Sequence, residues 1–167
     1  MSYAETLLSE FDQEMANTRK VLERIPDDKL DWKPHPKSNT IGWNANHVAD
    51  ILNWLVLALT RPSLDVAPPD GPKYEFPALT SRKAILDLFD RNVAAARKAI
   101  TEAKDEDMGQ PWTLSRAGQV FFTMPRSAVV RGTVLNHLIH HGAHLCVYLR
   151  LNDGPYIPGT GTSFRRR

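Results

Sequence analysis

Apolar residues recur at alternating steps of three and four along four long stretches of the chain, and prolines gather between these stretches. This spacing places the apolar side chains on one face of a helix. The first helix is predicted to begin at a capping box formed by Ser2 and Glu5 and to end before Pro26. The second and third helices are predicted over residues 41–60 and 80–103.

A fourth long helix is predicted near the C-terminus. Pro125 suits its first turn, where a missing amide hydrogen does no harm. The helix is expected to run through about Leu151 and to end before residues 152–155 (Asn-Asp-Gly-Pro), a strong stop signal. In the first three helices the positions predicted to point inward are Leu8, Phe11, Met15, Thr18, Leu22, Ile25, Val48, Ile51, Leu52, Leu55, Leu59, Ile85, Phe89, Val93, Ala96 and Ile100.

The segments between the helices differ in composition. Residues 26–40 contain three prolines and several turn formers, which predicts an extended connection. Residues 61–79 contain five of the twelve prolines and are expected to form a long crossing loop. Residues 105–126 have short apolar and β-branched runs around Ala117 and Gly118, typical of a small hairpin or an irregular loop.

Four amphipathic helices of this length predict an all-α four-helix bundle with one long crossover. We expect a single domain over residues 1–160, followed by a flexible basic tail over residues 161–167. At 167 residues, the chain buries roughly 70% of its unfolded surface on folding. It therefore needs no metal or disulfide for stability, and any bound metal is free to serve chemistry.

Cysteine and charge exclude several classes of protein. The one cysteine, Cys146, excludes an internal disulfide framework and Cys-based zinc motifs, and is expected to be a packed thiol in a reducing compartment. The net charge is +2, but without the three C-terminal arginines it is 18 − 19 = −1. A basic binding face needs clustered charge, so neither a nucleic-acid nor a membrane partner is expected.

The apolar runs also fall short of the roughly 20 residues of a membrane span. The N-terminus is too acidic and too polar for a signal peptide. We therefore expect the protein in the cytoplasm.

Histidine is the residue type that carries candidate chemistry, since five of the six histidines lie in two predicted helices. His137 and His141 are four residues apart, at the edge of the apolar face of the fourth helix. Imidazoles at this spacing project from successive turns and can bind one metal ion at about 2.0–2.1 Å. His140 and His144 have the same spacing, but they are rotated away from the core and rank second.

His47 is the candidate for a third ligand, because it lies in line with apolar residues near the start of the second helix. Catalytic zinc-type sites commonly use three protein ligands and leave one position open. The alternative for all three histidines is an ordinary core imidazole hydrogen-bonded to a carbonyl or carboxylate. His35 lies between two prolines and is expected to be exposed.

Other bundle chemistries find no support. The sequence has no Glu-x-x-His for a di-iron site and no His-Glu-x-x-His for a zinc protease. Asn44, Asp50 and Asn136 are candidates for orienting the imidazoles, each with the alternative of an exposed helix residue.

Two segments resemble the DinB/YfiT-like superfamily: LDWKPHPKSNTIGWNANHVADILNW and FTMPRSAVVRGTVLNHLIHHGAHLCVYLRLNDGPYIPG. The more specific elements are the Trp-x-Pro loop at Trp32, the histidine after Gly-Trp at His47, and the Asn-His-x-x-x-His run followed by Val-Tyr-Leu-Arg. The resemblance covers nearly the whole chain.

The resemblance implies a four-helix bundle that is commonly dimeric and holds a divalent ion such as nickel or zinc. Carried over by position, it implies His47, His137 and His141 as the ligands. It also implies a link to enzymes that use low-molecular-weight thiols, such as bacillithiol, mycothiol or glutathione. We therefore expect a homodimer that acts on a small molecule.

The sequence departs from the family pattern at two places. Relatives often read His-His-Arg-Gly-Gln-Leu where this chain has His-His-Gly-Ala-His-Leu at residues 140–145, so Gly142 and His144 replace a planar cation and an amide. The usual Tyr-Gly near the end is also absent, with residues 159–161 (Gly-Thr-Gly) in that neighbourhood. These changes concern contacts around the site rather than the candidate ligands.

Three functions fit these observations. The leading hypothesis is metal-assisted activation of a small thiol that attacks an electrophile. In the second, water replaces the thiol and the protein is a metal-dependent hydrolase. In the third, the protein is a metal-binding stress or scaffold protein without turnover.

Overall fold

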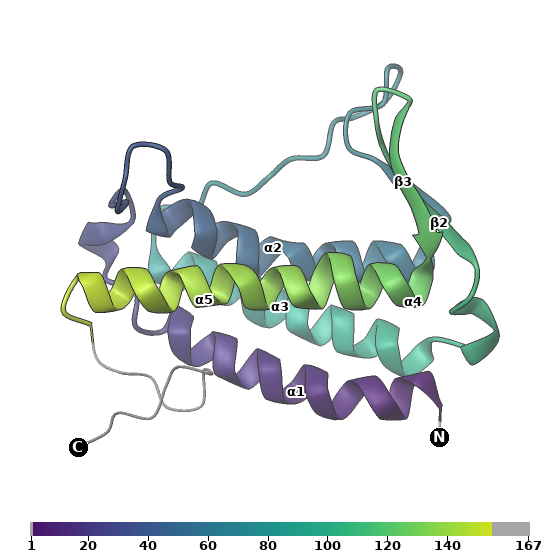
Figure 1. Cartoon of the computed structure of the whole chain (residues 1–167), viewed down its shortest axis with the longest axis horizontal. Coiled ribbons are helices and arrows are strands. Elements are labelled where there is room, and N and C mark those ends of the chain that lie inside the picture. Colours follow the sequence, from purple (N-terminus) through teal and green to yellow (C-terminus); the bar gives the residue numbers. More distant parts are fainter. Residues whose placement is uncertain (1, 155–167) are drawn as a thin grey trace.

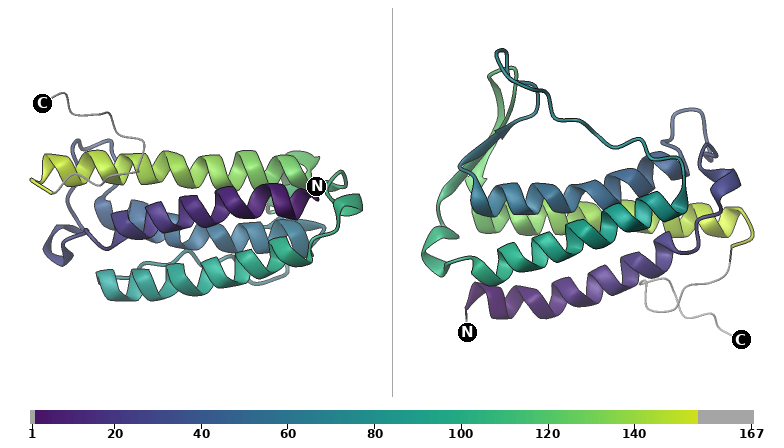
Figure 2. Two further views of the ribbon diagram at one scale, coloured as in Figure 1. Left: turned by 90° about the horizontal axis from the view of Figure 1, so that it is seen from below. Right: turned by 180° about the vertical axis from the view of Figure 1, so that it is seen from behind.

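The computed structural model describes residues 2–154, in which four long helical stretches lie side by side (Figures 1 and 2). They are α1 (Tyr3–Leu22), α2 (Ile41–Thr60), α3 (Arg82–Glu102) and a composite helix of α4 (Arg126–Ala128), η3 (Val129–Leu135) and α5 (Asn136–Leu151). The 3₁₀ turns η1 (Asp27–Lys29) and η2 (Asp105–Asp107) lie in the connections. The predicted helical bundle is confirmed, and the tail at residues 161–167 lies outside the described residues.

The direction of the helices explains the crossover. α2 and α3 run the same way, opposite to α1 and α5 (Figure 1). Parallel neighbours cannot be joined by a tight turn, so the chain returns along α2 through the long loop that the proline pattern predicts. Among residues 2–154, no helix combines the length and apolar character needed to cross a bilayer.

The helices begin where capping chemistry predicts. The Ser2 hydroxyl accepts a hydrogen bond from the Glu5 amide at 3.1 Å, and the Glu5 carboxylate accepts one from the Ser2 amide at 2.7 Å. The hydroxyls of Thr40 and Ser81 cap α2 and α3 in the same manner, at 3.0 and 3.2 Å. These bonds satisfy amides that have no partner within the helix.

The all-α prediction is wrong in one respect, because the chain also forms a three-stranded sheet in the order β1-β2-β3. β2 (Pro111–Arg116) and β3 (Gln119–Pro125) form the antiparallel hairpin that was one alternative for residues 105–126. β1 (Ser63–Asp65) lies in the predicted crossing loop and pairs with β2 in parallel. Three residues are too few to show a strand period, and β1 depends on a partner 50 residues later in the sequence.

Asp65 joins β1 to the tip of the hairpin. Ala117 and Gly118 both have positive φ, 51° and 78°, as a two-residue hairpin turn of the right twist requires. Positive φ strains alanine. The Asp65 carboxylate accepts hydrogen bonds from both turn amides, at 3.0 and 2.8 Å, which hold the strained turn. The same bonds, above all that from Gly118, lower the pKa of Asp65.

The predicted last long helix is present to Leu151, but it is not α-helical throughout, because η3 is π-helical. A π turn takes in an additional residue and rotates the helix face beyond it. The segment holds Gly132 and four β-branched residues, all of modest α-helix propensity. α5 begins at Asn136, so His137 and His141 keep the regular four-residue spacing.

The core follows the predicted apolar faces. Of the inward positions, Leu8, Leu59 and Val93 are partly buried and the others are buried. Trp112 is fully buried, whereas Trp43 is 46% exposed. Cys146 is buried, as the packed-thiol prediction expects.

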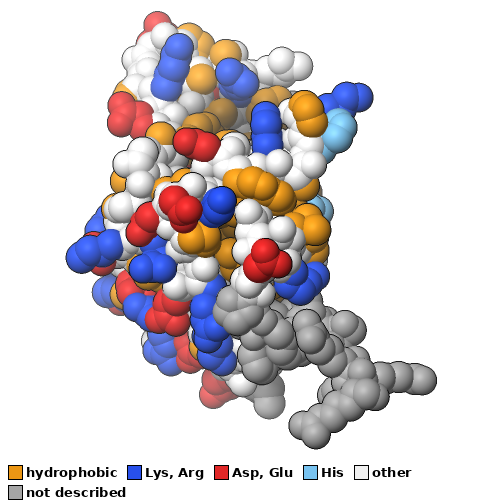
Figure 3. Space-filling model, turned by 90° about the vertical axis from the view of Figure 1, so that its left-hand side faces the viewer, with side chains coloured by type: hydrophobic (Ala, Val, Ile, Leu, Met, Phe, Trp, Pro, Cys, Tyr) orange, Lys and Arg blue, Asp and Glu red, His pale blue; other side chains and the backbone are white. Residues whose placement is uncertain are grey.

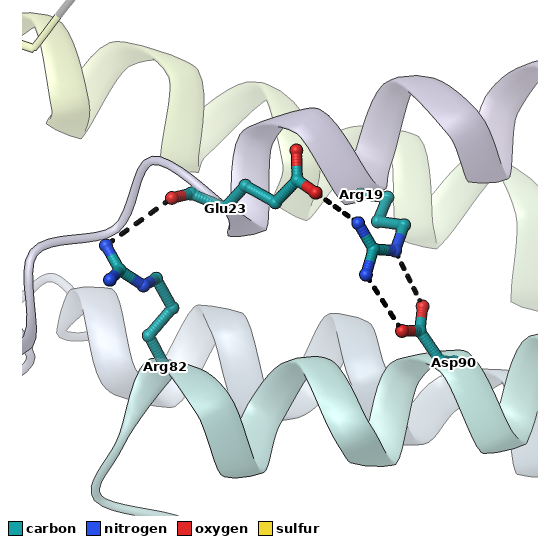
Figure 4. A network of polar contacts seen from close by, with 4 residues as sticks. All are labelled: Arg19, Glu23, Arg82 and Asp90. Carbon is teal, nitrogen blue, oxygen red and sulfur yellow. Dashed lines mark hydrogen bonds and ion pairs between the residues drawn. The ribbon is translucent and has the colours of Figure 1, made fainter.

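Polar contacts hold α1 against α3 (Figure 4). The Arg19 guanidinium donates to both carboxylate oxygens of Asp90, at 2.9 and 3.0 Å, and pairs with Glu23 on its own helix. Arg82 donates to the backbone carbonyl of Glu23 at 3.5 Å. Because Arg19 and Asp90 are both more than 40% exposed, these contacts align the helices more than they stabilise them.

The connection before α2 packs closely on the start of that helix. The Ile41 amide donates to the Trp32 carbonyl at 3.0 Å, and the Gly42 amide donates to the Leu30 carbonyl at 2.7 Å. A Cβ on Gly42 would lie 3.0 Å from the Leu30 oxygen. A side chain at position 42 would therefore press on the Leu30 backbone.

We expect opposite effects of alanine at two helical glycines. A Cβ on Gly142 would meet nothing within 4 Å, so Gly142→Ala should raise the free energy of unfolding by about 0.5–1 kcal/mol through lost unfolded-state entropy. Gly42→Ala should lower it because of the Leu30 carbonyl. Urea unfolding of both variants measures this, and destabilisation by Gly142→Ala would contradict the open environment described for it.

Candidate metal centre

α2 and α5 bring three imidazoles from distant parts of the sequence together. The Nε2 atom of His137 lies 3.0 Å from Nε2 of His47 and 2.8 Å from Nε2 of His141. One nitrogen from each ring lies within 4.8 Å of the others. His141 is 8% exposed, and His47 and His137 are half-buried. The three residues that the sequence singles out therefore form one cluster.

The spacing of the nitrogens is compatible with a shared divalent ion. Ligands that bind one tetrahedral ion at about 2.0–2.1 Å lie roughly 3.3 Å from each other. The separations of His137 Nε2 from His47 Nε2 and from His141 Nε2 are within about half an ångström of that value. Three imidazoles also form an all-nitrogen donor set that divalent transition metals accept.

Asn44 fixes the tautomer of His141. Its side-chain oxygen lies 2.9 Å from Nδ1 of His141, and its amide nitrogen donates to the Thr40 carbonyl at 2.8 Å. The second bond determines which end of the amide faces the ring. Nδ1 of His141 therefore carries the hydrogen, and the lone pair of Nε2 points toward the other two imidazoles.

Burial keeps the cluster neutral. It lowers the pKa of His47 to about 4, with a further contribution from His137. It lowers the pKa of His141 to about 3, with further contributions from the neighbouring imidazoles. The pKa of His137 is lowered for the same reason and by His140. Neutral imidazoles at pH 7 offer lone pairs, which is the form that metal binding requires.

Trp43 covers the cluster, a role that the sequence did not reveal. Its ring stacks on His47 at 4.9 Å between centroids and meets the edge of His141 at 5.5 Å. The four-residue spacing between Trp43 and His47 is the signal that could have indicated the stacking.

The candidates for orienting the imidazoles fare differently. Asn44 contacts His141, whereas both carboxylate oxygens of Asp50 accept from the Tyr74 hydroxyl at 2.9 Å. Burial raises the pKa of Asp50. Asn136 is exposed on α5. The structure therefore places Asn44 against a ring, gives Asp50 a different partner, and turns Asn136 toward solvent.

His140 and His144 lie beside the cluster rather than in it. Their ring centroids are 4.3 Å apart, and they lie 5.1 and 5.5 Å from the ring of His141. His140 is exposed, and His144 stacks on Tyr148. Burial and His140 lower the pKa of His144. His35 is exposed, as predicted.

A pocket of about 310 Å³ adjoins the cluster. It lies between α2 and the crossing loop, and its lining residues are Trp43, Asn46, His47, Asp50, Phe76 and Pro77. One candidate ligand, His47, is thus exposed to a space that can hold a small molecule.

With this geometry in place, comparison with known proteins identifies the family. The model of the DinB superfamily matches residues 10–145. The chain belongs to the DinB superfamily. A search of curated proteins found no match.

Two solved structures share the DinB fold with this chain. A DinB-like protein from Bacillus cereus ATCC 10987 has 24% identity and a TM-score of 0.70, with 95% of this chain and 97% of that chain covered. A DinB-like protein from Bacillus subtilis has 16% identity and a TM-score of 0.68, with 92% and 95% covered. At these identities the likeness supports the fold rather than a shared reaction.

The lowered pKa values predict a pH-dependent contribution to stability. The unfolded imidazoles take up protons near pH 6.5, but folded His47 does so only near 4 and His141 near 3. Unfolding therefore takes up protons in this window, and the stability of the metal-free protein should fall as the pH drops from about 6.5 toward 4.

The double variant His47→Gln/His141→Gln isolates this effect from the titration of carboxylates. The difference in unfolding free energy between the wild type and this variant should be constant above pH 7. Below pH 6 the wild type should lose more unfolding free energy than the variant does. A difference that does not change with pH would contradict neutral buried imidazoles.

Proposed function

We propose that His47, His137 and His141 bind one divalent metal ion, nickel or zinc, and that the protein uses it to activate a low-molecular-weight thiol for attack on an electrophilic small molecule. The observation that carries this proposal is the convergence of three neutral Nε2 atoms from two helices. A coordinated divalent ion lowers the pKa of a thiol or of water toward neutrality and so supplies a nucleophile.

The protein residues have separate tasks in this proposal. The three neutral imidazoles hold the ion without cancelling its charge, so its full effect on a bound thiol remains. Asn44 holds His141 with its lone pair in the binding direction. Trp43 covers one side of His47, and the adjoining pocket leaves room for the electrophile.

Metal analysis tests the binding step. The wild type, loaded with Ni²⁺ or Zn²⁺ and freed of excess metal, should retain about one ion per chain. His47→Ala and His141→Ala should retain less than about a tenth of that, since each removes a ligand. Asn44→Leu should lower the affinity about 10- to 100-fold, the range for residues that orient metal ligands.

His140→Ala and His35→Ala are the matched controls, because they remove an imidazole beside the cluster and one far from it. Both should bind metal as the wild type does. Equal retention by His47→Ala and the controls would contradict the three-histidine site.

A screen of thiol cosubstrates with electrophiles tests the reaction. Thiol-dependent turnover that His47→Ala abolishes supports the transferase. Cleavage of a substrate without thiol would contradict the transferase and indicate a metal-dependent hydrolase. A metal-loaded protein that turns over no substrate would indicate a metal-binding protein without catalytic activity.

We further propose a homodimer that pairs through the outer face of α5. Ile139, Val147 and Leu151 are 40%, 42% and 59% exposed on this helix, and they follow a four-residue register. Light scattering should give a dimer for the wild type, and Val147→Glu should shift it toward the monomer. A monomeric wild type would contradict the assembly.

A further inference from the structure

The pocket beside His47 has a fixed wall on the side of the crossing loop. The Leu79 amide donates to the Asn46 side-chain oxygen at 2.9 Å, and the Asn46 amide nitrogen donates to the Leu79 carbonyl at 3.0 Å. These two hydrogen bonds join the Asn46 side-chain amide to the backbone of Leu79, and they hold the loop against α2. Phe76 and Pro77, three and two residues before Leu79, are therefore held over the pocket.

The pocket has aromatic walls. Trp43 is 46% exposed and Phe76 is 57% exposed, large fractions for aromatic side chains that line a hollow. Phe76 packs on Tyr74 at 5.0 Å between ring centroids. Exposed aromatic faces bind flat apolar groups, and their negative faces also attract organic cations.

Asp50 contributes a negative charge to the lining. It is 7% exposed, and its hydrogen-bond donor is the neutral hydroxyl of Tyr74, which itself accepts from Asn53 at 3.1 Å. Within residues 2–154, the ion pairs of the structure involve other carboxylates. A buried carboxylate without a cationic partner is costly, and a ligand cation reduces that cost.

Acidic side chains also line a second pocket. It has a volume of about 390 Å³ and shares Trp43, Asn46 and Pro77 with the first, so the two adjoin. Asp27 and Asp31 contribute its charged side chains. The charged residues that line the two pockets are therefore all aspartates, and neither lining includes a lysine or an arginine. Around the pockets, the end of the bundle where α2 begins carries lysines and arginines interspersed with acidic residues (Figure 3).

We propose that the pocket formed by Trp43, Asp50 and Phe76 binds the protonated amine of a small organic substrate whose reacting end lies at the histidine cluster. This inference rests on the proposed function and specifies its substrate class. His47 and Asp50 are three residues apart on α2, so their side chains are neighbours on one helix face, roughly 5–6 Å apart at Cβ. A ligand of a few bonds spans that distance, with a metal-binding group at one end and an ammonium group at the other.

Three hydroxamates provide the test, because a hydroxamate chelates zinc and its substituent then lies beside the metal. They are benzohydroxamate and its 4-aminomethyl and 4-hydroxymethyl derivatives, measured by calorimetry on the zinc-loaded full chain. The aminomethyl compound should bind about tenfold more tightly than the hydroxymethyl compound, the order expected for a partly desolvated ammonium with an aromatic and a carboxylate partner. The 3-substituted isomers are measured in parallel, since either position can direct the amine toward Asp50.

Two pairs of variants locate the effect. Asp50→Asn should bring the affinity ratio of the two derivatives close to one, whereas Asp70→Asn, at an exposed aspartate of the crossing loop, should leave the ratio unchanged. Phe76→Ala should weaken the aminomethyl compound about threefold or more. Phe121→Ala, which removes an equally exposed phenyl ring from the hairpin, should not.

The outcomes separate this inference from the function on which it rests. If the chain retains no zinc, the proposed function fails before the substituents are compared. If zinc is retained and all three hydroxamates bind with equal affinity, or if Asp50→Asn keeps the preference for the amine, the amine pocket is refuted and the metal site stands. Zinc content and circular dichroism of each variant show whether it is loaded and folded.

Discussion

The register between α2 and α5 is the constraint on which the rest of this structure depends. His47 faces His137 and His141 only if the second turn of α2 lies level with the first two turns of α5. A hydrogen bond between Asn44 and His141 crosses the helix interface at this level. At the other end of α2, Arg126 donates to the carbonyls of Ala58 and Leu59, both at 2.8 Å. The composite last helix is therefore attached to both ends of α2, and sliding of one against the other would break both contacts.

The two ends of the bundle serve different purposes. At the end where α2 finishes, the sheet projects from the bundle (Figure 1). Asp65 holds the hairpin turn and the first strand of this sheet together. At the end where α2 begins, the connection before it and the end of the crossing loop pack around the same helical turns that carry Asn44 and His47. The long crossover thus does more than join two parallel helices. It supplies Phe76 and Pro77 to the pocket beside the histidines.

The sequence predicts what depends on local pattern and misses what depends on distant contacts. Apolar periodicity and capping residues predict four helices, and a four-residue spacing is enough to place His137 and His141 on neighbouring turns. The convergence of His47 with them depends on helix register, which no spacing within one helix contains. β1 is too short to have a pattern and exists because β2 pairs with it. Asp50 has the position of a residue that orients imidazoles, but Tyr74, from a loop without periodic signal, takes its carboxylate.

X-ray absorption spectroscopy of the nickel- or zinc-loaded protein tests the central claim most directly, because it reports the ligands of the ion itself. The account predicts a first shell with three imidazole nitrogens near 2.0–2.1 Å, together with the multiple-scattering signature of histidine rings, and the loss of one ring from that shell in any residual metal bound by His47→Ala. A first shell dominated by carboxylate oxygen, or one that His47→Ala leaves unchanged, would contradict it.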